Sequence, residues 1–259
     1  MKLLYVLPIL FGLVAGSNCM AACDCAEELK NDPVFMKKII ESVRQDLVKN
    51  PNILQEMVTA MQEHQATEKN EKIRNYIRSH PGEMVKNAPI LGNRSAVKTV
   101  FVWTDFSCPY CRRVHSELAR VLKERDDVRV VIKNFSIHGD LSDGPARAAI
   151  AAKIQDDDKA AKFVDLMMSR EFYSQDDLKD NTNLAKKVEA NIMKMAQEIG
   201  LDTDKLKKDM NSEIVSRELS DVRQIAQEFE IQGTPFLIIE EKAYPGAIPY
   251  NQILEALDK

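Results

Sequence analysis

Two cysteines, Cys108 and Cys111, are the residues of this chain whose type and spacing best support chemistry. They follow a strand-like run at 97–104 and begin a segment at 112–124 whose apolar residues recur at helical spacing. A thiol at the first turn of a helix lies close to unpaired backbone N–H groups and to the positive end of the helix dipole, and both favour its thiolate. We therefore expect Cys108 to attack disulfides. The more shielded Cys111, one turn further along, is expected to resolve the mixed disulfide that results.

Zinc binding is the other chemistry that such a pair commonly performs, but the sequence has no second downstream pair of cysteines to complete a four-ligand site. The start of the chain also bears on the choice. A basic Lys2, an apolar stretch at 3–14 and small residues at 15–17 are typical of a secretory signal. We expect residues 1–22 to be removed and the rest to be exported to an oxidising compartment, where a cysteine pair favours redox chemistry.

The composition and the hydropathy pattern argue against nucleic-acid binding and against an internal membrane span. Of 259 residues, 44% are hydrophobic and 29% are charged, with a formal net charge of -4 and a pI near 5.7. This balance gives no broad basic field of the kind that follows phosphates, so nucleic acid is not an expected partner. No internal apolar run approaches the roughly 20 residues that a membrane span needs.

The segment between the signal and the strand-like run is predicted to be helical. An N-cap side chain followed by proline, at Asp32-Pro33 and again at Asn50-Pro51, predicts two successive helices of about 15 residues. A third helix is predicted over 68–78, because His80-Pro81-Gly82 then stops it.

The first two of these helices carry apolar stripes at alternating spacings of four and three. The stripes consist of Met36, Ile40, Val43 and Leu47, and then Leu54, Val58 and Met61. Helices this short are marginal alone in water, so their stripes need a partner. Since symmetric pairing is the commonest solution for soluble chains, we expect residues 27–78 to make the protein a homo-oligomer, most simply a homodimer.

Beyond this arm, the order of strand-like and helical segments predicts an α/β fold. A second strand at 127–134 completes a βαβ unit with the first. Helical patterns then dominate from 144 to 229, and strand patterns return at 235–239 and around 243–244. A final helix is predicted from about Pro249.

Two runs resemble the paired signature of the DsbA-like branch of the thioredoxin superfamily, Phe106-Ser107-Cys108-Pro109-Tyr110-Cys111 and Gly233-Thr234-Pro235. The resemblance covers most of residues 85–259, and the added arm makes the chain similar to the suppressor-of-copper-sensitivity (ScsC-like) relatives. It implies a thioredoxin fold with an inserted helical domain, preceded by an N-terminal helical arm. The implied boundaries are a signal peptide at 1–22, an oligomerisation arm at 23–80, a first part of the thioredoxin fold at 81–139, the inserted helical domain at 140–229 and a second part at 230–259.

The same resemblance implies the members of the site. Besides catalysis by the cysteine pair, it implies that Pro235 is in cis beside Cys108. The backbone of Thr234 is then exposed, so that a substrate peptide can pair with it as an added strand. Pro109 and Tyr110 are expected to contact the same substrate. No metal is expected, and the only redox group is the disulfide of the cysteine pair.

Three positions bear on how the thiols are tuned. Many relatives have a buried acid six positions before the nucleophile to accept a proton, and Val102 occupies that position here. Asp105, three positions before Cys108, matches a residue common in DsbA-like relatives; it either takes part of that role or is an ordinary turn residue. His115, four residues after Cys111, either tunes the thiol or helps to bind copper, or it is an exposed helix histidine without a role.

The implied function is that of a periplasmic thiol–disulfide oxidoreductase that forms, reduces or isomerises disulfides in secreted proteins. Its expected partners are unfolded or misoxidised secreted proteins and a membrane redox partner protein. The motif does not give the direction of electron flow. Tyr110 replaces the histidine of the most oxidising relatives, which favours a more reducing or isomerising enzyme.

Three alternatives stay open at this point. The protein could be a monomeric DsbA-like oxidase whose arm packs on its own catalytic domain. It could instead be a copper-handling or chaperone module that binds through Met57, Met61, Cys23, Cys25 and the cysteine pair. Because Met20-Ala21-Ala22-Cys23 resembles a lipoprotein processing site, a lipid on Cys23 is the alternative to ordinary signal cleavage.

Overall fold

The computed structural model describes residues 32–174 and 183–259. The predicted signal peptide and the cysteines at 19, 23 and 25 lie outside the described residues. The chain divides into two compact units, Met1–Glu63 and His64–Lys259. The division falls inside a helix, whereas the sequence placed the end of the arm at residue 80.

The first unit contains the helix α2 (Pro33–Lys49) and the beginning of α3 (Asn52–Ser79). Asp32 begins α2 as predicted, because its carboxylate accepts hydrogen bonds from the backbone N–H groups of Val34 and Phe35. None of the residues of α2 is buried. Ile40 and Val43, from the predicted stripe, have exposed fractions of 61% and 52%.

The helix α3 is one continuous element of 28 residues, so the prediction of two separate helices here is wrong. The apolar stripe pauses after Met61, but residues 62–67 contain no proline or glycine, and nothing in them stops a helix. The second half of α3 belongs to the second unit. There Ile73 is fully buried and Tyr76 packs edge-on against Phe229.

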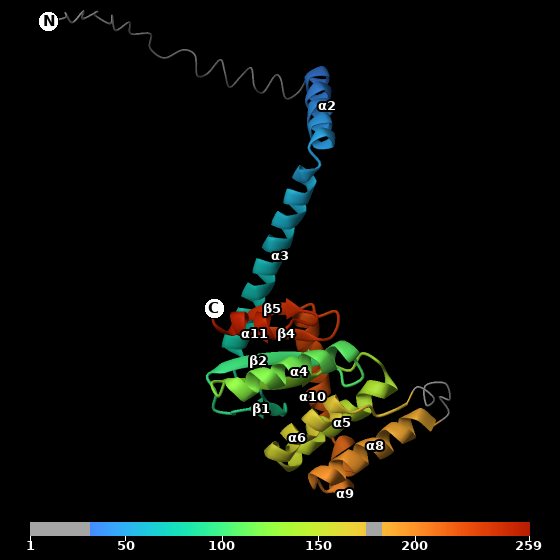
Figure 1. Ribbon diagram of the computed structural model, residues 1–259. Coiled ribbons are helices and arrows are strands. Elements are labelled where there is room, and N and C mark those ends of the chain that lie inside the picture. The colour runs from blue at the N-terminus through green and yellow to red at the C-terminus, as the bar shows by residue number, and fades with distance from the viewer. Residues whose placement is uncertain (1–31, 175–182) are drawn as a thin grey trace, which may run out of the picture. The chain divides into compact units, whose positions relative to one another are not determined.

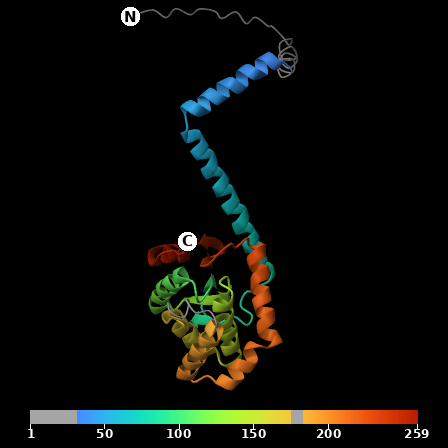
Figure 2. The same cartoon turned by 90° about the vertical axis from the view of Figure 1, so that its right-hand side faces the viewer.

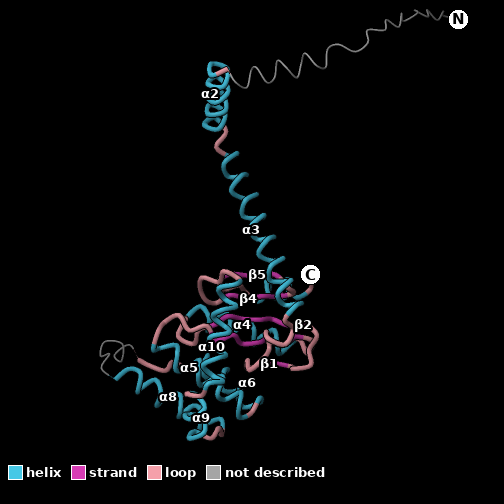
Figure 3. The backbone as a smooth tube through the Cα atoms, turned by 180° about the vertical axis from the view of Figure 1, so that it is seen from behind, coloured by secondary structure: helices cyan, strands magenta, loops and turns pink. Residues whose placement is uncertain are grey.

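The second unit is built on a five-stranded mixed sheet with the order β1-β3-β2-β4-β5. Figure 3 shows the sheet from behind, with its strands in magenta. Only β2 and β3 pair in parallel, as the ends of a βαβ unit must, and the other neighbours are antiparallel. The strands are β1 (Ile90–Gly92), β2 (Lys98–Thr104), β3 (Val128–Asn134), β4 (Phe236–Ile239) and β5 (Lys242–Pro245).

Side chains alternate between the two faces of this sheet and form two separate cores. On one face, Val102 and Ile132 pack with α4 (Pro109–Glu124) and α11 (Tyr250–Leu257). On the other face, Trp103 and Val131 pack with α10 (Glu213–Glu228). Figure 2 shows α10, in orange, on the side of the sheet opposite α4, in green.

The helical insertion lies between β3 and β4, and Figure 1 shows its helices labelled α5, α6, α8 and α9 below the sheet. Asp156, Asp202 and Ser212 begin three of its helices with side chains that accept backbone N–H bonds. Among the described residues, no helix has both the length and the apolar character needed to cross a membrane. The insertion contains α5 (Asp140–Gln155), α6 (Asp157–Ser169), α8 (Leu184–Ile199), α9 (Thr203–Met210) and α10.

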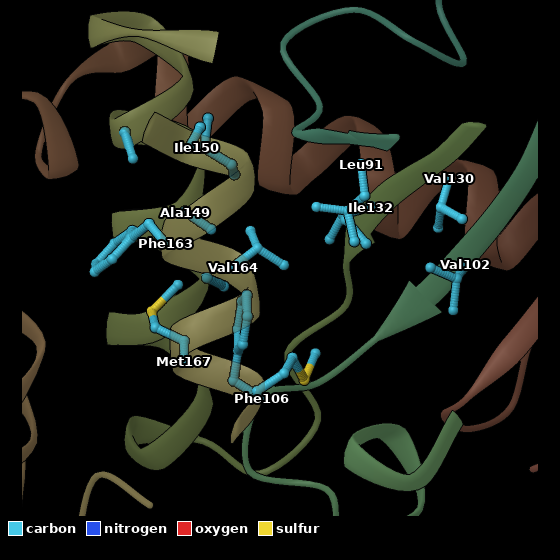
Figure 4. Packing of buried hydrophobic residues seen from close by; sticks show 14 of the residues in the cluster. Leu91, Val102, Phe106, Val130, Ile132, Ala149, Ile150, Phe163, Val164 and Met167 are labelled. Carbon is cyan, nitrogen blue, oxygen red and sulfur yellow. The ribbon is translucent and has the colours of Figure 1, made fainter. Parts of the chain in front are cut away.

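One aromatic side chain joins the cysteine loop to this insertion. Phe106, in the loop that leads from β2 to α4, is 1% exposed and packs in the same cluster as Val164 and Met167 of α6 (Figure 4). Its ring also meets Phe172 edge-on, with centroids 6.5 Å apart.

The order of the strands and helices confirms the predicted fold class, an α/β thioredoxin fold with an inserted helical domain and a helical arm before it.

Candidate active site

Cys108 occupies the N-cap position of α4, with the φ of -82° and ψ of 119° that are usual for this position. Unlike most N-cap residues, it gives the helix no side-chain hydrogen bond. Pro109 follows at the first helical position, where a missing N–H costs nothing. The Cys108 thiol is thus held at the positive end of the helix while only 5% of the residue is exposed.

The predicted partner loop lies directly across from this thiol. The Thr234-Pro235 bond is cis, and the Cys108 Sγ lies 3.6 Å from the carbonyl oxygen of Thr234, a residue 126 positions away. The N–H of Gly246 donates to the Pro235 carbonyl over 2.9 Å and fixes the loop against β5. Tyr110, with an exposed fraction of 63%, projects beside the cysteines into solvent.

Cys111 is the more shielded of the two thiols, with 1% of the residue exposed. Its Sγ accepts a hydrogen bond from the backbone N–H of Asp105 over 3.4 Å. Burial raises the pKa of the Cys111 thiol to about 12, although the hydrogen bond from the Asp105 N–H acts in the opposite direction. At neutral pH, Cys111 is therefore held as a thiol and must lose a proton when it attacks.

Both oxygens of the Asp105 carboxylate accept hydrogen bonds, and these bonds fix the cysteine loop. It is 1% exposed and accepts from the Ser107 N–H at 2.8 Å, the Ile137 N–H at 2.9 Å and the Ser142 hydroxyl at 2.7 Å. His138 Nδ1 lies 2.9 Å from the same carboxylate. These contacts are those of a residue that positions the loop. The partnership with His138 was missed, because nothing in a spacing of 33 residues indicates it.

His115 is buried, so its interpretation as an exposed helix histidine is wrong. Its Nε2 lies 2.9 Å from a carboxylate oxygen of Asp165 on α6, an acid that the sequence analysis did not consider. One turn earlier, Arg112 donates to the backbone carbonyls of Met168 and Arg170 at the end of α6. Both contacts tie α4 to the helical insertion.

The residues proposed for copper handling fall in different places. Met57 and Met61 are exposed in the first unit, and Cys23 and Cys25 lie outside the described residues. Within 32–174 and 183–259, no group of three or more His, Cys, Asp or Glu side chains is arranged to hold a metal ion.

A groove with a volume of about 390 Å³ adjoins the cis-proline loop. Its apolar surface comes from Pro235, Phe236 and Pro245, and it continues past Thr234, whose carbonyl faces Cys108. The groove therefore reaches the loop that faces Cys108, while neither cysteine belongs to its lining. Its complete lining is Lys69, Glu230, Gln232, Gly233, Thr234, Pro235, Phe236, Pro245 and Gly246.

Comparisons with known proteins agree with this geometry. A family model described as thioredoxin matches residues 84–259. Disulfide bond formation protein D of Bacillus subtilis (strain 168) is 24% identical over 179 residues, which cover 68% of this chain and 78% of that protein.

Two solved structures illustrate the likeness. A thioredoxin-like oxidoreductase from Silicibacter pomeroyi DSS-3 is 30% identical, with a TM-score of 0.58 over 68% of this chain and 94% of that one. ScsC of Proteus mirabilis in a transitional conformation is 22% identical, has a TM-score of 0.59 and covers 88% of this chain and 97% of that one. Since the family model spans the whole sheet and both cysteines, the chain belongs to the thioredoxin family, in its DsbA-like branch of thiol–disulfide oxidoreductases.

Proposed function

We propose that this protein forms, reduces or isomerises disulfides in secreted proteins through Cys108 and Cys111. The observation that carries the proposal is the position of Cys108, which begins α4 without capping it and faces the Thr234 carbonyl at 3.6 Å. The buried Cys111 lies one turn behind it. The names of two similar proteins, a disulfide bond formation protein and a thioredoxin-like oxidoreductase, support the same chemistry.

The reaction proceeds by two exchanges of sulfur–sulfur bonds. The Cys108 thiolate attacks one sulfur of a substrate disulfide, and the other substrate sulfur leaves and takes up a proton. Cys111 then loses its proton and attacks the Cys108 sulfur, which releases the first substrate sulfur as a thiol. The products are a Cys108–Cys111 disulfide and a substrate reduced by two electrons. The reverse sequence oxidises a substrate dithiol.

The cysteine roles are tested by exchange with a scrambled, disulfide-bonded model protein. We expect Cys108→Ser to reduce turnover to the uncatalysed rate, because a serine hydroxyl is not a nucleophile toward disulfides. Cys111→Ser should instead accumulate a mixed disulfide on Cys108, since the resolving thiol is missing. Thiol-blocked, non-reducing gels distinguish the two variants, and equal trapping by both would contradict these assignments.

The periplasm is the proposed place of action. The supporting feature is the signal-like sequence at 1–22, which lies outside the described residues. In that compartment, unfolded or misoxidised secreted proteins are the substrates. A membrane redox partner protein restores the cysteine pair to its working oxidation state after each net oxidation or reduction.

Isomerase activity is proposed to depend on assembly through the arm, most simply as a homodimer. Supporting this, α2 buries none of its residues, and Met57, Val58 and Met61 on α3 are each more than half exposed. Such an apolar surface is unusual on a monomer and typical of a contact with another copy. Two catalytic centres held together keep one substrate engaged through repeated exchanges.

Paired charge substitutions on α2 test this assembly. The double variant Ile40→Glu, Val43→Glu should be monomeric and lose most isomerase activity while keeping simple disulfide reduction. Its control, Ser42→Glu with Gln45→Glu, adds the same charge to the opposite face. Substitutions are preferable to a truncation near residue 89, which would remove the fully buried Ile73. A wild-type protein that light scattering shows to be monomeric at micromolar concentration would favour the monomeric oxidase instead.

A further inference from the structure

The groove beside the cis-proline loop contains one cation, Lys69, which comes from α3 and not from the sheet. We propose that Lys69 binds a carboxylate of the substrate, so that the enzyme prefers segments with Asp or Glu within a few residues of the reactive cysteine. This inference rests on the proposed function and adds a substrate class to it. The occupant of the groove is thus an acidic, cysteine-containing peptide segment.

The ammonium group of Lys69 is positioned without being neutralised. Its Nζ donates to the backbone carbonyl of Glu230 over 3.1 Å and lies 5.3 Å from the centre of the Phe236 ring. A carbonyl and a ring face hold a cation but carry no net charge. No ion pair formed among the described residues includes Lys69, so its charge and at least one N–H donor remain available to a ligand.

The acids nearest to the groove are directed toward a different lysine. A carboxylate oxygen of Glu230 lies 3.8 Å from Lys72 Nζ, and one of Glu228 lies 3.4 Å from the same atom. Lys72 does not line the groove. The negative charge of Glu230, the only acid in the lining, is therefore partly compensated, and the cation beside Phe236 is not.

The segment of α3 that carries Lys69 is fixed in place by its neighbours. Asn70 Oδ1 accepts the backbone N–H of Ala243 on β5 at 2.9 Å. Further along, Arg78 donates two 3.0 Å hydrogen bonds to the carboxylate of Glu241. Since the backbone of Lys69 is already held at the groove, binding a carboxylate there orders only the end of its side chain.

The position of the groove sets which part of a substrate meets Lys69. A segment whose cysteine reaches Cys108 passes the Thr234 carbonyl and then lies over Pro235 and Phe236, where Lys69 stands. An apolar residue suits the proline and phenylalanine surface, and a neighbouring carboxylate reaches the ammonium group. Pairing an incoming anion with a partly exposed lysine favours both encounter and binding, but only modestly.

The proposal is tested with matched disulfide-linked peptides that differ only in having Asp or Asn at each position near the cysteine. At one or two positions, we expect the acidic peptide to be exchanged with a kcat/KM about three times that of its amide counterpart. This preference should fall toward unity at high salt, because the pair is partly exposed to solvent. Lys69→Gln should abolish the preference, and Lys69→Arg should keep it.

Two further variants separate this subsite from general charge effects. Lys208→Gln removes the same charge from α9, at the far end of the unit from β4 and β5 (Figure 1), and should keep the preference. Glu230→Gln removes the one acid from the groove lining and should increase it. Equal exchange of acidic and amide peptides by the wild-type protein, or an unchanged preference in Lys69→Gln, would overturn the proposal.

A binding measurement distinguishes failure of this proposal from failure of the proposed function. The same peptides with serine in place of cysteine cannot exchange, so their dissociation constants report the groove alone. We expect the acidic peptide to bind about threefold more tightly than the amide, and Lys69→Gln to remove the difference. If no peptide is exchanged but this difference persists, the catalytic assignment fails and the subsite stands. If exchange occurs without any difference in binding or rate, the subsite fails.

Discussion

The helices α2 and α4 have nearly equal lengths, 17 and 16 residues, and each begins with an N-cap residue followed by proline. Each also carries apolar residues at spacings of three and four. The helix α4 buries Val114, Leu118 and Val121 against the sheet, whereas α2 buries no residue. The same local sequence pattern therefore specifies a helix in both places but does not specify what covers its apolar side.

The two N-caps differ in a way that matters for chemistry. The Asp32 carboxylate accepts two N–H bonds from the first turn of α2. Cys108 gives no such bond to α4, and its thiol meets the Thr234 carbonyl instead. A capping side chain satisfies the helix end, and the energy of that bond is typically about 1 kcal/mol. In α4 the positive helix end is left available to a sulfur atom that must carry negative charge.

We expect the largest difference between the two helices in the free energy of unfolding that is lost when one apolar side chain in each is truncated to alanine. Leu118→Ala should lower the free energy of unfolding by about 2–5 kcal/mol, because Leu118 is 1% exposed and its loss leaves a cavity. Ile40→Ala, at a residue 61% exposed, should change it by no more than about 0.5 kcal/mol.

Urea denaturation at low protein concentration, where assembly through the arm is weakest, measures both changes. Running each variant again at high concentration adds a second comparison, since only the loss of stability in Ile40→Ala should then be larger than at low concentration, whereas the loss in Leu118→Ala should stay the same. If Ile40→Ala is as costly as Leu118→Ala at every concentration, α2 is covered within its own chain, and the contrast between the helices is wrong.

Much of the second unit could be predicted from the sequence, because its signals are local. Two strands, the helix between them and the cysteine pair follow from periodicity and from residues within about ten positions of one another. The contact between Cys108 and Thr234 could not be predicted in that way, because the two residues lie 126 positions apart. It was expected only because Gly233-Thr234-Pro235 resembles a known signature.

The residues that sequence reasoning missed are polar groups whose partners lie far away in the chain. Lys133 follows the apolar run 130–132 of β3, yet it is fully buried and pairs with Glu218 of α10 at 3.2 Å. Burial raises the pKa of Glu218, and the lysine opposes that shift. His138 and Lys69 likewise have partners that no spacing rule connects. Periodicity identifies which residues are apolar, but it does not identify which charges the fold brings together.

The titration of Cys111 has a smaller expected effect on stability, and it tests whether the start of α4 is buried. The pKa of its thiol is about 12 in the folded, reduced protein, against roughly 8.5 for an exposed thiol in the unfolded chain. Below about pH 8 both states keep the proton, so the contribution to stability is complete. Between the two pKa values only the unfolded chain has lost it. Stability should therefore fall as pH rises, by up to about 1.4 kcal/mol per pH unit.

The variant Cys111→Ala has no thiol to titrate at this position, so its stability at each pH is the reference for that of the wild-type protein. With excess reductant, the stability of the wild-type protein relative to Cys111→Ala should fall by about 1.4 kcal/mol between pH 7.5 and pH 9.5. Urea denaturation at several pH values measures the difference, and titrations shared by both proteins cancel from it. A difference that stays constant over this range would mean that the Cys111 thiol titrates in the folded protein as it does in water. The start of α4 would then be as accessible to solvent as α2, and the contrast drawn between the two helices would not extend to the active site.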